Sequence, residues 1–80
     1  METLRELMSR VLDINKEEVV RSSSPDTISS WDSFNGLMLI SELEKNFDVK
    51  FTMDETMMIQ NVGDIRKALE KYSVTEGLDV

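Results

Sequence analysis

Neither cysteine nor histidine occurs among the 80 residues of the chain. Without cysteine there is no disulfide framework and no thiolate metal site. Without histidine the chain lacks the commonest general base and the commonest metal ligand. The acidic segment 48–55 does not match an EF-hand loop, because Lys50 and Phe51 occupy positions that would have to bind the ion. We therefore expect no metal site and no catalytic site; the chain is not predicted to be an enzyme.

Glycine and proline are also scarce, with three glycines and one proline in the whole chain. The glycines are scattered, so they form no glycine-rich phosphate loop. Pro25 follows three consecutive serines and marks the clearest break in the sequence. No apolar run approaches the length of a membrane span, and the N-terminus does not resemble a signal peptide. These features predict a cytoplasmic protein with no membrane span.

The charge is strongly unbalanced, with 16 acidic residues against nine basic residues and a net charge of −7. Nucleic-acid binding through phosphate contacts needs a basic face, so we expect no nucleic-acid partner. The acidity is compatible with docking onto basic surfaces of partner proteins. It is equally compatible with a role in solubility alone.

The length and periodicity of the chain predict one small all-α domain. A chain of this size buries only about 60–65% of its unfolded surface, so we expect a thin stability margin and a monomer without a deep cleft. No segment alternates strictly between apolar and polar residues, whereas helical spacing recurs. We predict a small four-helix bundle, with three main helices and a short third one, over residues 1–73, followed by a flexible tail over 74–80. The predicted helices span residues 2–13, 33–47 and 54–59, with a last one beginning after residue 61.

Local signals support the helix starts. Thr3 and Thr52 are each followed three residues later by a glutamate, which is the capping-box arrangement. Asn61 is a good N-cap for the last helix. The connection 14–31 is long for so small a domain, and long loops of this kind are often functional or held down by their own side chains. The apolar residues that could hold it are Ile14, Val19, Val20, Ile28 and Trp31.

The helix predicted over residues 33–47 carries more apolar side chains than one buried face requires. A core stripe is formed by Gly36, Leu39, Ile40, Leu43 and Phe47. Phe34, Leu37 and Met38 are left over, on the flank that also carries Ser41 and Glu44. This flank is either part of a wide buried face or an exposed patch that docks a partner.

Ser33 lies at the start of this helix, beside free backbone N–H groups and the positive end of the helix dipole, a setting that suits a phosphate. The competing interpretation is that Asp32 or Ser33 only caps the helix. Ser33 is not expected to act as a nucleophile by itself, because the nearest candidate base on the helix, Lys45, is about three turns away. If Ser33 is modified, another protein must perform the reaction.

Two further groups of residues carry weaker predictions. The adjacent carboxylates Asp54 and Glu55 are expected to be solvated. Met53, Met57 and Met58 cluster around the short third helix, where they either fill an adaptable core or form a soft wall that opens for an apolar guest.

Four segments together resemble the acyl carrier protein family. Residues 12–19 resemble the end of the family's first helix and the turn after it. The segment 31–34, Trp-Asp-Ser-Phe, is similar to the Asp-Ser-Leu modification motif, with phenylalanine in place of leucine. Residues 39–47 resemble the pattern of the second helix, which ends in Leu-Glu-x-x-Phe, and residues 61–65 match the start of the last helix. The resemblance covers about residues 3–72.

The resemblance implies that Ser33, within the motif that begins at Asp32, carries 4′-phosphopantetheine transferred from coenzyme A by a separate phosphopantetheinyl transferase. The thiol of that arm would hold an acyl group as a thioester, and acyl-loading and acyl-transfer enzymes would be the other partners. In this family the acyl chain can lie between the helices. The corresponding lining here would be Leu39, Ile40, Leu43, Met57, Met58 and Ile59.

One departure from the family concerns partner choice. Typical fatty-acid carriers have an acidic second helix, whereas this chain has Asn35 and Met38 after the motif and Lys45 where an acid is common. Weaker electrostatic steering and more hydrophobic contact are expected. We therefore expect partner docking through Phe34, Asn35, Leu37, Met38, Ser41 and Glu44, in a fatty-acid-like pathway or a specialised lipid, glycolipid or polyketide pathway. A peptidyl or D-alanyl carrier and an unmodified acidic interaction module remain alternatives.

Overall fold

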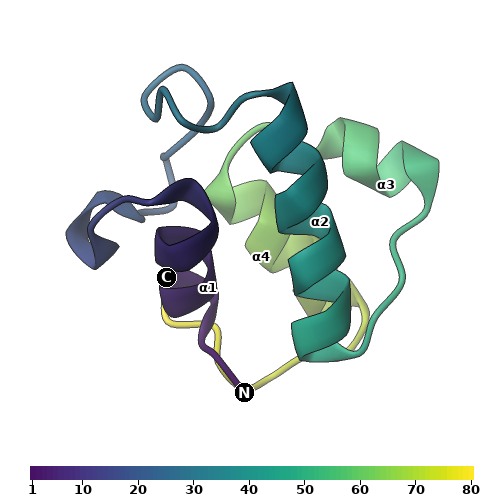
Figure 1. Cartoon of the computed structure of the whole chain (residues 1–80). Coiled ribbons are helices and arrows are strands. Elements are labelled where there is room, and N and C mark those ends of the chain that lie inside the picture. Colours follow the sequence, from purple (N-terminus) through teal and green to yellow (C-terminus); the bar gives the residue numbers. More distant parts are fainter.

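The computed structural model describes all residues from 1 to 80 and contains four α-helices and no strands. The helices are α1 (Leu4–Leu12), α2 (Ser33–Phe47), α3 (Met53–Met58) and α4 (Val62–Lys71), with a 3₁₀ turn, η1 (Lys16–Glu18), after α1. Figure 1 shows α2 in the middle of the fold, with α1 on one side and the short α3 on the other. The predicted all-α bundle with a short third helix is confirmed.

The helix ends are set by local sequence, as predicted. Thr3 and Thr52 form complete capping boxes at α1 and α3, and the side chain of Asn61 accepts a hydrogen bond from the Asp64 N–H at α4. Asp13 and Asp48 end α1 and α2 in the left-handed conformation, with φ angles of 53° and 54°. Asparagine and aspartate adopt this conformation more readily than other non-glycine residues, which explains the two stops.

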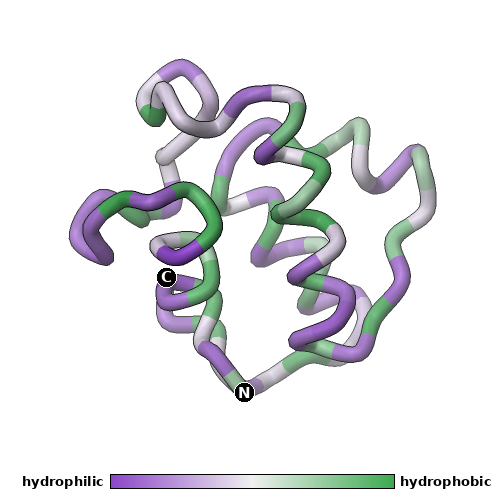
Figure 2. The backbone as a smooth tube through the Cα atoms, viewed as in Figure 1, coloured by the Kyte–Doolittle hydropathy of each residue, from purple (hydrophilic) through white to green (hydrophobic).

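One hydrophobic core joins α1, α2 and α4. Of the predicted core stripe of α2, Leu39, Leu43 and Phe47 are buried in it, whereas Gly36 and Ile40 are half-buried. Figure 2 shows hydrophobic segments recurring along these three helices. The buried apolar residues of the core are Leu4, Leu7, Met8, Leu12, Val19, Ile28, Trp31, Leu39, Leu43, Phe47, Phe51, Val62, Ile65 and Leu69. α3 contributes none of them, so the core does not depend on it.

The long connection between α1 and α2 is held to the core by four of its apolar residues, the buried Val19, Ile28 and Trp31 and the partly buried Ile14. Val20 does not do so: it is 45% exposed, because Val19 takes the inward position and its neighbour points to solvent. The backbone of the loop also binds α4, where the Val62 N–H donates to the Ser23 carbonyl at 2.9 Å. The path of this loop fixes the entry into α2.

Residues 74–80 were predicted to form a flexible tail; in the structure they make hydrogen bonds to α1 and α4. The Leu4 N–H donates to the Gly77 carbonyl at 2.7 Å, and the Arg5 N–H donates to the Asp79 carboxylate at 2.9 Å. Both contacts satisfy N–H groups that the first turn of α1 leaves unpaired. The Arg66 guanidinium donates to the Leu78 carbonyl at 2.8 Å, which binds the tail to α4 as well. A domain boundary at residue 73 stays a prediction.

Candidate functional site

Ser33 is the first residue of α2 and is exposed. The helix is capped by Asp32, whose carboxylate accepts a hydrogen bond from the Asn35 N–H at 2.8 Å. The Gly36 N–H donates to the Asp32 carbonyl at 2.7 Å. The first-turn N–H groups of Ser33 and Phe34 remain without an intrahelical partner. Asp32 therefore does the capping, and the hydroxyl of Ser33 stays available at the positive end of α2.

The position of Ser33 is fixed by the residues around it. Trp31 is only 7% exposed, and its indole lies so close to Gly36 that a Cβ there would be 3.7 Å from the indole nitrogen. The side-chain amide of Asn35 donates to the Ser30 carbonyl at 2.8 Å. The Ser30 hydroxyl in turn donates to the Leu12 carbonyl at 2.6 Å, at the end of α1. These contacts hold the turn before α2 in place, and we call it the braced turn. Ser33 projects from it.

A cavity of about 170 Å³ lies beside Ser33, between α2, α3 and α4. Six of its nine lining residues are hydrophobic. The lining consists of Trp31, Ser33, Gly36, Leu37, Leu39, Ile40, Thr56, Ile59 and Ile65. An apolar cavity of about this size, roughly 150 Å³, holds a benzene molecule in another protein. The space therefore matches a short apolar chain that begins near Ser33.

Half of the six residues expected to line an acyl pocket lie on this cavity, namely Leu39, Ile40 and Ile59. Leu43 does not, because one turn farther along α2 it is fully enclosed in the core. Met57 and Met58 do not either, being 73% and 74% exposed. The six-residue α3 turns Thr56 toward this cavity, whereas Met58 lines a separate groove between α3 and α4. This arrangement also corrects the idea that the methionines of α3 fill the core.

The apolar flank of α2 is exposed. Phe34 and Leu37 are each 70% exposed, and Met38 is 45% exposed. Ser41 is also exposed on α2. The structure therefore favours the exposed patch over the wide buried face.

Two other residues expected in the patch, Asn35 and Glu44, are half-buried and bonded within the protein. Asn35 donates to Ser30, as described above. The Glu44 carboxylate accepts from the Phe51 N–H at 2.9 Å. Their side chains are committed to the fold, so they are less suited to docking than their sequence positions suggest.

The other carboxylate of α2, that of Glu42, is paired with basic residues. Glu42 lies 2.7 Å from the Arg10 guanidinium of α1 and 3.7 Å from the Lys45 ammonium. The hydrogen bond from Arg10 lowers the pKa of Glu42. Because Glu42 and Glu44 are the only acidic residues within α2, the helix presents little free negative charge beside its apolar patch.

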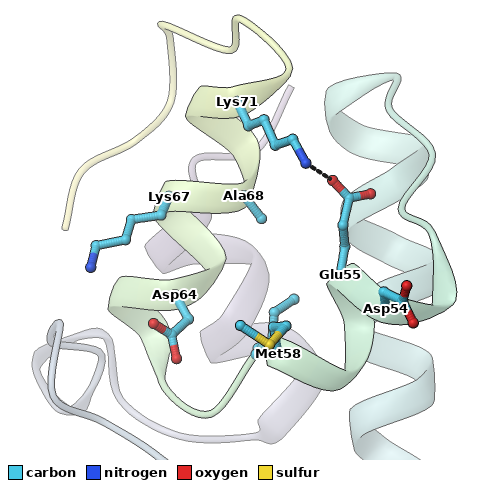
Figure 3. A pocket seen from close by; sticks show the side chains of 8 residues that line it. Asp54, Glu55, Met58, Asp64, Lys67, Ala68 and Lys71 are labelled. Atoms are coloured by element: carbon cyan, nitrogen blue, oxygen red, sulfur yellow. Dashed lines mark ion pairs between the residues drawn. The ribbon is translucent and has the colours of Figure 1, made fainter.

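Glu55 of α3 forms an ion pair and hydrogen bonds that were not predicted from the sequence, apart from the bond to Thr52. Its side chain is only 13% exposed and lies 3.1 Å from the Lys71 ammonium, whereas we expected a solvated carboxylate. The same carboxylate accepts from the Thr52 N–H at 2.8 Å and from the Tyr72 hydroxyl. Figure 3 shows Glu55 reaching from α3 toward Lys71 on α4, beside a groove of about 420 Å³ between the two helices. The capping box predicted only the Thr52 contact.

The titration of Tyr72 provides a test of this contact. The hydrogen bond to Glu55 raises the pKa of Tyr72. The hydrogen bond from the Thr52 N–H, together with that from Tyr72, lowers the pKa of Glu55 to about 2. Since the folded-state pKa of Tyr72 lies above its ordinary value, the stabilisation is fully present below about pH 10 and is lost as the pH rises through the folded-state value. Tyr72 is the only tyrosine, so ultraviolet absorption of tyrosinate reports it alone. We expect Glu55→Gln to lower its midpoint; an unchanged midpoint would contradict the contact.

A family model described as a phosphopantetheine attachment site matches residues 2–69. The residues around Ser33 fit such a group: the hydroxyl is exposed, unpaired N–H groups at the start of α2 favour a phosphate, and an apolar cavity opens beside them. None of the helices is long and apolar enough to span a membrane. Carrier domains of this family are typically non-catalytic and interact with phosphopantetheinyl transferases and acyl-handling enzymes. The chain therefore belongs to the phosphopantetheine attachment site family, whose members bear a covalently bound 4′-phosphopantetheine.

Proposed function

We propose that this chain is a monomeric and cytoplasmic acyl carrier protein, with no catalytic activity of its own, and that Ser33 is its attachment point. The observation that carries the proposal is at the start of α2. Asp32 supplies the capping hydrogen bond there, so the Ser33 hydroxyl is left exposed. The bound arm supplies a thiol that holds the cargo as a thioester. The absence of histidine and cysteine agrees with a protein whose partners supply the reactive groups.

The residues of the chain bind and orient the phosphate end of the arm. The positive end of the α2 dipole and the unpaired N–H groups of Ser33 and Phe34 favour a negatively charged phosphodiester. The Asp32 carboxylate is directed to the Asn35 N–H, which offsets its charge next to the phosphate. The braced turn formed by Trp31 and Ser30 keeps Ser33 at the surface, within reach of the transferase.

The character of the cavity supports an acyl cargo over an aminoacyl or peptidyl one. Leu39, Ile40 and Ile59 give it an apolar wall, in which a charged ammonium group would lose its hydration without gaining a partner. Its volume matches a chain of about six carbons, by comparison with a cavity that holds benzene. The family match also supports a modified carrier over an unmodified interaction module.

The surface beside Ser33 supports service to a specialised lipid, glycolipid or polyketide pathway. Fatty-acid carriers of the usual kind present an acidic second helix, whereas Glu42 is paired here with Arg10 and Lys45. Phe34, Leu37 and Met38 offer exposed apolar area instead. Docking of the acyl-loading and acyl-transfer enzymes then depends mainly on hydrophobic contact and only weakly on ionic strength.

Met38→Glu tests the docking surface. We expect the thermal midpoint to stay within a few degrees of the native value, because an exposed substitution typically changes stability by about 0.5 kcal/mol or less. The kcat/KM of the transferase and of acyl-transfer enzymes should fall about tenfold or more for those that contact the apolar patch. Steady-state kinetics and thermal unfolding measure the two effects.

Val20→Glu is the matched control, because Val20 has the same exposed fraction, 45%, but lies outside α2. It should leave kcat/KM unchanged for every enzyme. Unfolding of the Met38→Glu variant would place Met38 in the core, and equal kinetics for both variants would show that the patch does not dock partners.

The direct test of the proposed function is transfer from coenzyme A by a broad-specificity phosphopantetheinyl transferase, followed by an intact mass. The native chain should gain the mass of one phosphopantetheinyl group. No gain would refute the assignment of the chain as a carrier.

A further inference from the structure

α3 is held to the rest of the domain by very few contacts. None of its residues is buried, and Met53, Met57 and Met58 are all more than 70% exposed. Ile59, directly after the helix, packs partly against the core. A helix of six residues is too short to be stable on its own propensity. Its position must therefore depend on specific side-chain contacts.

Glu55 makes contacts of this kind to the end of α4. One carboxylate oxygen accepts from the Thr52 N–H and the Tyr72 hydroxyl, and the other lies 3.1 Å from the Lys71 ammonium. Lys71 ends α4 and Tyr72 follows it, so a single side chain joins the first turn of α3 to the end of α4. The ring of Tyr72 is in turn packed edge-on against Phe51, with centroids 5.9 Å apart.

α3 also forms one wall of the cavity beside Ser33. Thr56 lies one residue after Glu55, and both Thr56 and Ile59 line that cavity, opposite Leu37 and Ile40 of α2. A movement of α3 away from α4 would therefore widen the opening of this cavity to solvent. Glu55, which holds α3 to α4, and Thr56, which lines the cavity, lie in the same turn of α3. A shift of this turn would therefore change the cavity.

We propose that Glu55, Lys71 and Tyr72 form a latch that positions α3 as the movable wall of the Ser33 cavity and so controls how well a bound acyl chain is shielded. Glu55 is the positioning residue of this latch. The inference deepens the proposed function and rests on it for the cargo. The position of α3 itself does not depend on any modification of Ser33.

The latch is tested by Glu55→Gln and Tyr72→Phe. Glu55→Gln keeps an oxygen for the Thr52 N–H and removes the charge that pairs with Lys71. Tyr72→Phe removes the hydroxyl and keeps the ring against Phe51. Amide hydrogen exchange over residues 53–59 should become faster by about tenfold or more in each variant, as expected for the loss of one hydrogen bond to a charged group. Exchange in α1 and in the core turns of α4 should not change.

The consequence for cargo is measured on the same variants loaded at Ser33 with a hexanoyl arm from hexanoyl-coenzyme A. Cleavage of the thioester by hydroxylamine should become faster by a similar factor in Glu55→Gln and Tyr72→Phe. Glu70→Gln is the matched control, because Glu70 lies on the exposed side of α4 and pairs only with Arg66, at 3.9 Å. It should behave as the native chain in both measurements.

The outcomes separate the latch from the proposed function. Unchanged exchange over residues 53–59, or faster exchange in all four helices, would overturn the latch. Faster exchange with an unchanged rate of thioester cleavage would overturn its role in shielding the cargo. A failure of the native chain to accept the hexanoyl arm would refute the carrier assignment, while the exchange of the unmodified chain still decides whether Glu55 positions α3.

Discussion

Ser33→Ala is expected to abolish the gain in mass when the chain is incubated with coenzyme A and a broad-specificity phosphopantetheinyl transferase. The substitution removes the hydroxyl oxygen to which the phosphate would be joined. It leaves the helix start intact, because Asp32 and not Ser33 supplies the capping hydrogen bond. The thermal midpoint should therefore change little, and intact-mass spectrometry should show the unmodified chain alone.

Ser22→Ala is the matched control for this experiment. Ser22 is also an exposed serine, but it lies in the connection between α1 and α2, away from the start of any helix and from the apolar patch of α2. This variant should be modified as fast as the native chain. A Ser33→Ala protein that still gained the mass would show that another residue carries the arm.

Leu39→Ala should destabilise the domain strongly and Leu37→Ala hardly at all, although both remove the same atoms from the same helix. Leu39 is 1% exposed, and truncation of a buried leucine destabilises a domain by about 2–5 kcal/mol. For a domain of this size, a loss of about 3 kcal/mol lowers the thermal midpoint by roughly 15 °C. Leu37 is 70% exposed, so its truncation should change the free energy of unfolding by about 0.5 kcal/mol or less.

Thermal and urea unfolding of the two variants measure this difference, with the native chain as reference. Equal destabilisation would mean that α2 is buried on both flanks and that the apolar patch does not exist. A large difference, together with slower loading of Leu37→Ala by partner enzymes, would assign one face of α2 to the core and the neighbouring face to docking.

The elements of the fold could be predicted because their signals are local. Thr3, Thr52 and Asn61 satisfy N–H groups within three residues of themselves, so the sequence around each is enough to place a helix start. The left-handed stops at Asp13 and Asp48 act over a similar distance. The predicted bounds of the helices accordingly differ from the observed ones by only one or two residues.

The environment of the site could be predicted only in part. Periodicity correctly separated the buried Leu39 and Leu43 from the exposed Phe34 and Leu37. The helical repeat alone determines which residues of a helix share a face. It could not place Met57 and Met58, since a helix of six residues has no second turn to show which side is buried. It could not foresee that Asn35 and Glu44 bond to the backbone of other segments.

The sequence by itself determined the helices, the core stripe of α2 and the position of Ser33 at a helix start, because hydrogen bonding within a turn and helical periodicity are short-range. Only the tertiary structure decided which charges are free and what holds α3. Glu42 meets Arg10 across 32 positions of the chain, and Glu55 meets Tyr72 across 17. Residues so far apart in the chain meet only because the helices pack against one another. That packing depends on all the side chains of the core together and not on any local pattern.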